Sequence, residues 1–473
     1  MFRKVLYRKT YPVNLGKEGV SEVHDFHKFY IRKRANMRNK KIFLFCLNVS
    51  IIFSALSISI SQGFLFLSLL FFLIDKREKK WVNPVSILGF LLFASYLASS
   101  VYHSFTLGMD EGLKLLPKSE FKDIILFFGF FLTLNLDSYE RKRVMNSFQI
   151  LILLLVITGL VSIFTEVRLA VRINELFREI KTWRFTHHYG DILNIRISVP
   201  IGLMNTHLTF GGLLAFFFPY LIFTLVFKLK TRGLKHSIPL IIFLTVLSII
   251  ILLNNARSAM FGIFFSLCFG TLDTVWNREI ISKKRILKLA TYSFSFMIIL
   301  VSILYFNDTT SKTIKPLLGA EKHTDSGRTF IWNSSFPMIL KNPIFGVGPG
   351  RYDKENSLER KNLSEEKQEL AFFYQVSQTG HAHNDYFHLA TVSGIPTAII
   401  FILILFFIMK ELLSKNHTYP QTAIFYGLVG FFFASTLQCY FQDDEVVILF
   451  WYLCGLLFNK RENEEKTIQV SEA

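Results

Sequence analysis

The densest group of titratable side chains lies in the stretch HAHNDYFHLATVSGIP, residues His381–Pro396. His381, His383, Asn384 and Asp385 come just before an apolar run, so we expect them at the mouth of a membrane helix. An imidazole with a pKa near ~6.5 can remove a proton at neutral pH. His383 is therefore a candidate general base, with the other three residues in support. The alternative is that His383 caps the helix or pairs with a buried backbone group.

Three arginines, Arg196, Arg257 and Arg328, are predicted on the same side of the membrane as this cluster. Arginine keeps its charge and binds two phosphate oxygens at once. Arginines beside a histidine suit an anionic lipid headgroup, above all a diphosphate. The histidine can activate a hydroxyl while the arginines stabilise the departing charge. Two structural alternatives stay open: Arg257 could be a snorkelling residue at a helix end, and Arg328 could pack the loop that carries it.

Other polar motifs are interpreted as structural. Arg351 is expected to be a solvated turn residue. The stretch HHYGD, with His187, His188 and Asp191, resembles half of a metal site, but no Cys or Glu at ligand spacing completes it. The glycine-rich GVGPG follows no strand and opens no clear helix, which argues against nucleotide binding. We therefore expect no metal and no cofactor.

The composition is that of a membrane protein. Of the 473 residues, 51% are hydrophobic and 19% are charged, whereas soluble domains carry about 25% charged residues. Blocks such as SFQILILLLVITGLVSIF (Ser147–Phe164) hold no charge and are long enough to cross the hydrocarbon core. We predict an all-α polytopic membrane protein with about twelve transmembrane helices. The predicted spans are residues 42–57, 59–74, 84–103, 121–136, 147–165, 207–227, 237–253, 258–276, 289–306, 386–409, 421–440 and 445–458.

The net charge of +18 does not indicate a nucleic-acid partner, because the distribution of the basic residues is explained by the orientation of the chain in the membrane. With the N-terminus inside, 33 of the 53 Lys and Arg residues fall in cytoplasmic segments, and none falls in a span. The short outer connections hold few basic residues, as the positive-inside rule requires. Both termini are thus predicted in the cytoplasm, and two large loops, about 166–206 and 307–384, on the outer face.

Three regions follow from this topology. Residues 1–41 form a basic cytoplasmic segment expected to lie along anionic membrane lipids, residues 42–458 form the membrane domain, and residues 459–473 form a cytoplasmic tail. The apolar stripe in Val167–Phe185 predicts a helix in the plane of the interface. The 307–384 loop, between spans 9 and 10, is large and helical. Its stretch Ser326–Asn342 has helical spacing that Pro337 is expected to break.

Three motifs together resemble the O-antigen ligase and O-antigen polymerase superfamily of bacterial inner-membrane glycosyltransferases. In HNDYFHLATVSGIPT, His383 and Asn384 are followed after nine residues by Gly394, although Thr397 stands where the family pattern has a second glycine. LLNNARSAMFG is similar to the turn with a family arginine, here Arg257. RISVPIGLMNTHLTFGGLLA is a looser match that suggests Arg196. SGRTFIWNSSFPMILKNPIFGVGPGRY resembles a third family stretch, at Arg328, Trp332, Pro343, Gly346 and Gly348.

The resemblance implies a metal-independent transfer of glycan from undecaprenyl diphosphate to an acceptor hydroxyl at the periplasmic face. In ligases the acceptor is the lipid A–core saccharide. His383 would be the general base, and Arg257 and Arg196 would bind the diphosphate, with Arg328 as a further candidate. An O-antigen polymerase and a protein O-oligosaccharyltransferase share this donor and stay open as alternatives. A transporter or flippase fits less well, because such proteins place ionisable residues near the bilayer midplane.

Overall fold

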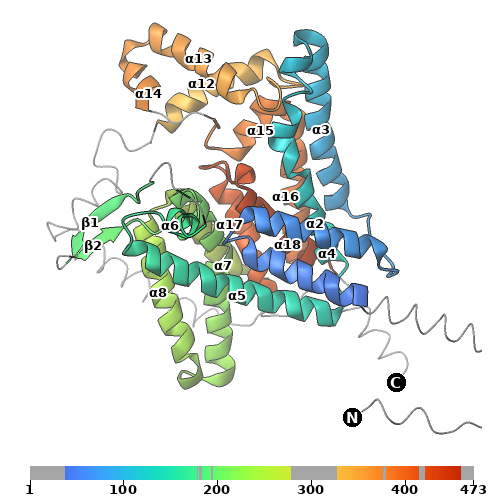
Figure 1. The fold of residues 1–473 in the computed structure, drawn as a ribbon, viewed down its shortest axis with the longest axis vertical. Helices are drawn as coiled ribbons and strands as arrows, with labels where there is room; N and C mark the ends of the chain where they lie inside the picture. Colours follow the sequence, from blue (N-terminus) through green and yellow to red (C-terminus); the bar gives the residue numbers. More distant parts are fainter. Residues whose placement is uncertain are drawn as a thin grey trace, which may run out of the picture.

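The computed structural model describes residues 38–177, 179, 184–192, 195–277, 327–376, 380–414 and 421–459. Within these ranges the chain is almost entirely helical, which confirms the predicted all-α membrane class (Figure 1). The predicted ninth span, residues 289–306, lies outside the described residues, as do most of the N-terminal segment and the C-terminal tail.

Among the described residues, six helical spans are long and apolar enough to cross a membrane. They are α3 (Pro84–Leu107), α5 (Ser138–Ile163), α7 (His207–Arg232), α8 (Ile238–Asn254) with the turn before it from Lys235, α9 (Arg257–Leu272) with the turn after it to Val275, and α16 (Ile395–Leu413). Several other predicted spans are shorter helices, so the described residues do not establish a count of twelve. These are residues 38–53, α2 (Ile58–Ile74), α4 (Ile124–Leu134), α17 (Tyr426–Ala434) and α18 (Asp444–Phe458).

The core is built on α4 and α18. Every side chain of α18 from Val446 to Phe458 is buried, as expected of a helix that is apolar all round. The two helices approach until their backbones touch: a Cβ on Gly455 would lie 2.2 Å from the carbonyl oxygen of Phe130. Thr133 adds a hydrogen bond from its hydroxyl to the carbonyl oxygen of Tyr452, at 3.0 Å. These helices are therefore surrounded by protein and need not match the thickness of the bilayer.

A small hairpin departs from the all-α prediction. Strands β1 (His188–Ile192) and β2 (Ile195–Ser198) pair antiparallel at one side of the bundle (Figure 1). The prediction of one continuous helix over Val167–Phe185 is also wrong: among the described residues of this segment, α6 (Leu169–Glu175) is the helical part. The backbone of Val167 pairs instead with that of Phe185, which folds the segment back on itself. The apolar stripe therefore belongs to a short helix and a bridge.

Three helices of the long loop lie together over the ends of α3 and α15 (Asp385–Ser393), at the top of Figure 1. They are α12 (Arg328–Lys341), α13 (Tyr352–Glu366) and α14 (Ala371–Val376). The helix α12 continues through Pro337, contrary to the prediction. A proline removes one backbone hydrogen bond, and here buried residues on both sides of it, among them Ile331 and Met338, hold the helix.

The prediction that Arg351 is a solvated turn residue is wrong. Its side chain is buried and forms ion pairs with Glu111 and Glu355. The Glu111 pair joins α13 to the segment that follows α3. It could not be foreseen because the two residues lie far apart in the sequence.

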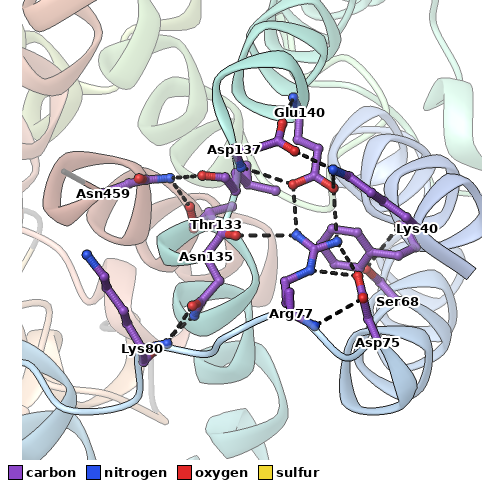
Figure 2. Close-up of polar contacts among 12 residues, drawn as sticks. Lys40, Ser68, Asp75, Arg77, Lys80, Thr133, Asn135, Asp137, Glu140 and Asn459 are labelled. Atoms are coloured by element: carbon purple, nitrogen blue, oxygen red, sulfur yellow. Dashed lines mark hydrogen bonds and ion pairs between the residues drawn. The ribbon is translucent and has the colours of Figure 1, made fainter. Parts of the chain in front are cut away.

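The opposite ends of the helices meet in a polar cluster that we call the clasp, formed by Lys40, Asp75, Arg77, Asp137 and Glu140 (Figure 2). The Arg77 guanidinium donates to both carboxylate oxygens of Glu140, at 2.8 and 3.0 Å, and to Asp75 at 2.7 Å. Lys40 pairs with Asp137, whose carboxylate also accepts from the backbone N–H of Glu140 at the start of α5.

Two asparagines extend the clasp to the neighbouring segments. Asn135 exchanges hydrogen bonds with the backbone of Lys80, and Asn459 donates to the carbonyl oxygen of Leu136 at 2.8 Å. The cluster thus unites four segments that the basic-residue pattern places on one side of the membrane: residues 38–40, 75–80, 135–140 and 459 (Figure 2).

We expect the Arg77→Met substitution to destabilise the fold by about 3–5 kcal/mol, because it leaves two buried carboxylates without their cation. Asp75 and Glu140 are only 3% and 0% exposed. Thermal unfolding in detergent, followed by intrinsic fluorescence, measures the change. Lys114→Met is the matched control, since Lys114 pairs with Asp110 on the surface and should not shift the midpoint measurably. Equal shifts in the two variants would contradict a central role for the clasp.

Candidate functional site

The polar cluster predicted at a helix mouth lies at the start of α15, which Asn384 caps. The Asn384 side chain accepts from the backbone N–H of Phe387 at 3.0 Å and donates to the carbonyl oxygen of Thr436 at 3.0 Å. The predicted tenth span is broken at Gly394, whose φ is 90°. A Cβ there would lie 2.0 Å from the carbonyl oxygen of Ile344. The span is therefore a short helix, α15, followed by the membrane-length helix α16.

The glycine-rich stretch braces this break. The backbone N–H groups of Val347 and Gly348 donate to the last carbonyl oxygens of α15, those of Thr391 and Val392, at 2.8 and 2.9 Å. The backbone N–H of Ile395, the first residue of α16, donates to the carbonyl oxygen of Pro343 at 2.8 Å. The PIFGVGPG segment is thus a backbone support for the site.

His383 is buried, being 7% exposed, and has a left-handed backbone with φ of 49°. Its Nδ1 lies 2.8 Å from the carbonyl oxygen of the Gln438 side chain. An oxygen can only accept, so Nδ1 carries the proton and Nε2 keeps its lone pair. Nε2 has no hydrogen bond within the described part of the chain. The arrangement is that of a base whose tautomer is fixed by a neighbour.

The electrostatics keep this imidazole neutral. Burial lowers the pKa of His383, the Gln438 hydrogen bond opposes the shift, and the positive charge of Arg328 lowers the pKa further. The neighbouring ring of His381 lies 4.4 Å away between centroids, and burial lowers the pKa of His381 to about 3. Both histidines are therefore uncharged at neutral pH, and His383 can accept a proton there.

Arg328 is brought to His383 by the way α12 is seated. It is the first residue of α12, and Trp332 follows four residues later on the same face of the helix. The Trp332 indole donates to the carbonyl oxygen of Ala382 at 2.9 Å and stacks on Phe387. Trp332 thus fixes α12 against the His383 segment and keeps the Arg328 charge within range of the imidazole.

Asp385 acts as a brace and not as a second base. Its carboxylate accepts from the backbone N–H groups of Tyr440 and Phe441, each at 3.1 Å, and its own N–H bonds to Ser435. Burial raises the pKa of Asp385 to about 8. Through these hydrogen bonds, Asp385 fixes the segment between α17 and α18 against the start of α15.

That segment carries two functional candidates that the sequence analysis missed, Gln438 and Tyr440. The Tyr440 hydroxyl is 2.9 Å from that of Ser258, the residue after Arg257 at the start of α9. Burial raises the pKa of Tyr440, while the Ser258 hydrogen bond and the charge of Arg328 oppose this shift. Tyr440 thus contacts the segment that carries Arg257 and lies within range of the Arg328 charge. A polar amide near the end of an apolar predicted span was the available signal for Gln438.

Arg196 lies elsewhere. It is on β2, 43% exposed, in an ion pair of 2.8 Å with Glu166. In Figure 1 the hairpin stands at the side of the bundle, away from α15. Contacts among the described residues do not join Arg196 to His383. Tyr440, by contrast, contacts Ser258 beside Arg257 and lies within range of the Arg328 charge.

His388 secures the other face of α15. Its Nε2 lies 3.1 Å from a carboxylate oxygen of Glu120, which also accepts from Gln442. Burial would raise the pKa of Glu120, but the hydrogen bond and charge of His388 bring it below its usual value. The described residues contain no group of three or more His, Cys, Asp or Glu arranged to hold a metal ion.

Comparison with known proteins identifies one family. Residues 240–402 match the family model described as O-antigen ligase. The matched stretch runs from α8 into α16 and includes Arg257, Arg328 and His383, whereas Arg196, Gln438 and Tyr440 lie outside it. No curated protein matches the chain.

We expect diethylpyrocarbonate to acylate His383 with a pH midpoint below the usual histidine value of ~6.5, because the site favours the neutral ring. Arg328→Gln should move that midpoint upward, since a positive charge that opposes protonation is removed. Arg328→Lys is the control that keeps the charge and should leave the midpoint nearly unchanged. Tandem mass spectrometry separates the adduct on His383 from one on His381. The same midpoint in the wild type and Arg328→Gln would show that the guanidinium does not influence the imidazole.

Proposed function

We propose that this chain, whose residues 240–402 match the O-antigen ligase family, transfers a glycan from undecaprenyl diphosphate to a hydroxyl of the lipid A–core saccharide. The superfamily supports a glycosyltransferase of the O-antigen ligase or polymerase type acting on lipid-linked glycans. The proposal adds the donor, the acceptor and the place. In it, the enzyme is a multi-pass protein of the bacterial inner membrane with cytoplasmic termini and a periplasmic site.

The observation that carries the proposal is the convergence of a neutral imidazole with two arginine segments. Arg328 acts on both His383 and Tyr440, and Tyr440 is hydrogen-bonded to Ser258 beside Arg257. These contacts, with the Trp332–Ala382 hydrogen bond, support a grouping of the proton acceptor with guanidinium groups from α9 and α12 at the start of α15. A lipid diphosphate bound there would have its acyl chain in the membrane and its phosphates against arginine.

In the proposed reaction, Nε2 of His383 takes the proton of the acceptor hydroxyl as that oxygen attacks the anomeric carbon of the glycan. The bond from that carbon to the diphosphate oxygen breaks, and its electron pair leaves on undecaprenyl diphosphate. Gln438 stabilises the imidazolium that forms by accepting from its Nδ1–H. The negative charge that develops on the leaving group is stabilised by Arg257 and Arg328.

Arginines also suit a transfer that needs no metal ion. Two guanidinium groups can bind the diphosphate oxygens bidentately and neutralise charge that a divalent cation would otherwise balance. Arg196 remains part of the proposal as a further diphosphate contact, reached from the hairpin side. His381, Asn384 and Asp385 support the base by packing, capping and bracing the segment.

The ligase reaction is preferred to the polymerase reaction on the strength of the first motif. The departure from that motif, Thr397, is fully buried and donates hydrogen bonds to the carbonyl oxygen of Ser393, across the break at Gly394, and to Ser95 of α3 at 2.9 Å. Thr397 therefore packs α16 on α3. Among the described residues, its hydrogen bonds involve neither His383 nor the arginines, so this departure from the family motif should not alter the chemistry.

We expect His383→Asn to lower glycan transfer by about 10²–10⁴-fold, the usual contribution of a general base. Asn tolerates the left-handed backbone, so this variant removes the imidazole without straining the turn. Gln438→Leu should give a smaller loss, since the base remains but its tautomer is no longer fixed. Activity of a purified, correctly inserted His383→Asn protein equal to the wild type would refute the assignment.

Electrophoresis of lipopolysaccharide from a deletion strain, complemented with these variants, distinguishes the reactions. A ligase predicts loss of all capped species and accumulation of lipid-linked chains. Lipid A–core bearing a single repeat unit would indicate a polymerase, and a normal ladder would indicate another acceptor and refute the proposal.

Arg257→Lys should impair transfer even though the charge is kept, because an ammonium group cannot reproduce bidentate phosphate binding. Turnover should persist in the presence of a chelator. In-vitro transfer with purified donor and acceptor measures both. Full activity of the Lys variant would reduce Arg257 to a generic charge, and strong inhibition by the chelator would overturn the metal-independent mechanism.

A further inference from the structure

A cavity lined by basic and apolar side chains lies at the clasp end of the molecule. This cavity of about 640 Å³ opens between the helix of residues 38–53 and the first turns of α5. We call it the basic groove; its lining includes Lys40, Lys41, Leu44, Phe45, Tyr139 and Arg143. We propose that this groove binds the phosphodiester headgroup of an anionic phospholipid, with an acyl chain along its apolar wall.

The charges in the groove leave two cations available. Glu140 is held by Arg77 in the clasp, and Lys40 is paired with Asp137. Lys41 and Arg143 are exposed and have no carboxylate partner within the part of the chain that the structure describes. The groove therefore presents a net positive charge to its surroundings.

Tyr139 prepares Arg143 for an anion. The Arg143 Nε donates to the Tyr139 hydroxyl at 3.2 Å, and the guanidinium lies 5.5 Å from the centre of the ring. These contacts use one donor and leave the terminal N–H groups to bind phosphate oxygens. Lys41 supplies a second charge from the neighbouring helix.

The apolar half of the groove suits an acyl chain. Lys41, Leu44 and Phe45 lie on one face of their helix at spacings of three and four residues, so the wall changes from charged to apolar along the chain. The Phe45 side chain is 61% exposed and faces outward. Basic residues at a helix end followed by apolar ones match a lipid headgroup above its tail. Free phosphate would gain nothing from an apolar wall, so the wall favours a lipid as the ligand.

The groove is separate from the proposed glycan-transfer site. The 15-residue helix α18 begins beside Asp443 and ends at Asn459, which contacts the clasp segments. At 1.5 Å per residue this helix is about 22 Å long. The two sites are therefore at opposite ends of the helices, and the groove cannot hold the diphosphate of the donor during transfer.

The test measures lipid binding by the full chain in mixed micelles, by native mass spectrometry and by the thermal midpoint. Phosphatidylglycerol should bind and raise the midpoint, and phosphatidylcholine should not, because only the former carries a net negative charge. Lys41→Ala with Arg143→Ala should weaken phosphatidylglycerol binding by about tenfold. Both altered positions are exposed, so the midpoint without lipid should stay unchanged.

The matched control removes the same charge from the same two helices outside the groove. Arg38→Ala with Lys142→Ala changes exposed residues that do not line the cavity, and it should keep most of the binding. Equal losses in the two double variants would overturn the proposal in favour of general surface attraction. Equal binding of both lipids, or full competition by millimolar inorganic phosphate, would also overturn it.

Discussion

The backbone N–H groups of Tyr440 and Phe441 donate hydrogen bonds to the buried side chain of Asp385. The geometry of the candidate site depends on this contact. It fixes the segment between α17 and α18 against the first turn of α15. Gln438 and Tyr440 come from this segment, while His383 comes from the residues just before α15. Because a carboxyl group buried without hydrogen-bond partners is strongly unfavourable, separating the two segments would carry a cost in free energy.

The same principle operates at the other end of the bundle with different consequences. In the clasp, Arg77 forms ion pairs with two buried carboxylates and has a structural role. At the candidate site, the charge of Arg328 acts on a histidine and a tyrosine, both neutral at ordinary pH. Arginine at one end therefore closes a network of opposite charges. At the other end it creates a positive region beside a neutral base, which suits an anionic ligand.

The sequence predicted the elements of the site better than their connections. Residue type and the family resemblance singled out His383, Arg257 and Arg328 as candidates, and the stretch matched by the family model includes all three. The partner of His383, Gln438, could not be predicted because 55 residues separate them and a turn decides which side chain faces the ring. Arg351 was misjudged for the same reason, since its partner Glu111 is 240 residues away.

Length-based prediction of spans also has a physical limit. An apolar stretch is ambiguous between a helix that faces lipid and one that is surrounded by protein. The fully buried α18 and the short α4, in backbone contact at Gly455, are of the second kind. The break at Gly394 is a further case, where hydropathy continues but close packing against Ile344 requires a residue without a Cβ.

The backbone of His383 connects packing with chemistry. Its left-handed φ of 49° costs on the order of 1 kcal/mol, and the flanking residues keep it in place. The carbonyl oxygen of Ala382 accepts from Trp332, and the N–H of Asn384 donates to the sulfur of Cys439. The same turn directs Nδ1 to Gln438. Since Trp332 also positions Arg328, one indole governs both the strained turn and the charge beside it. The orientation and the protonation of the base are therefore coupled through α12.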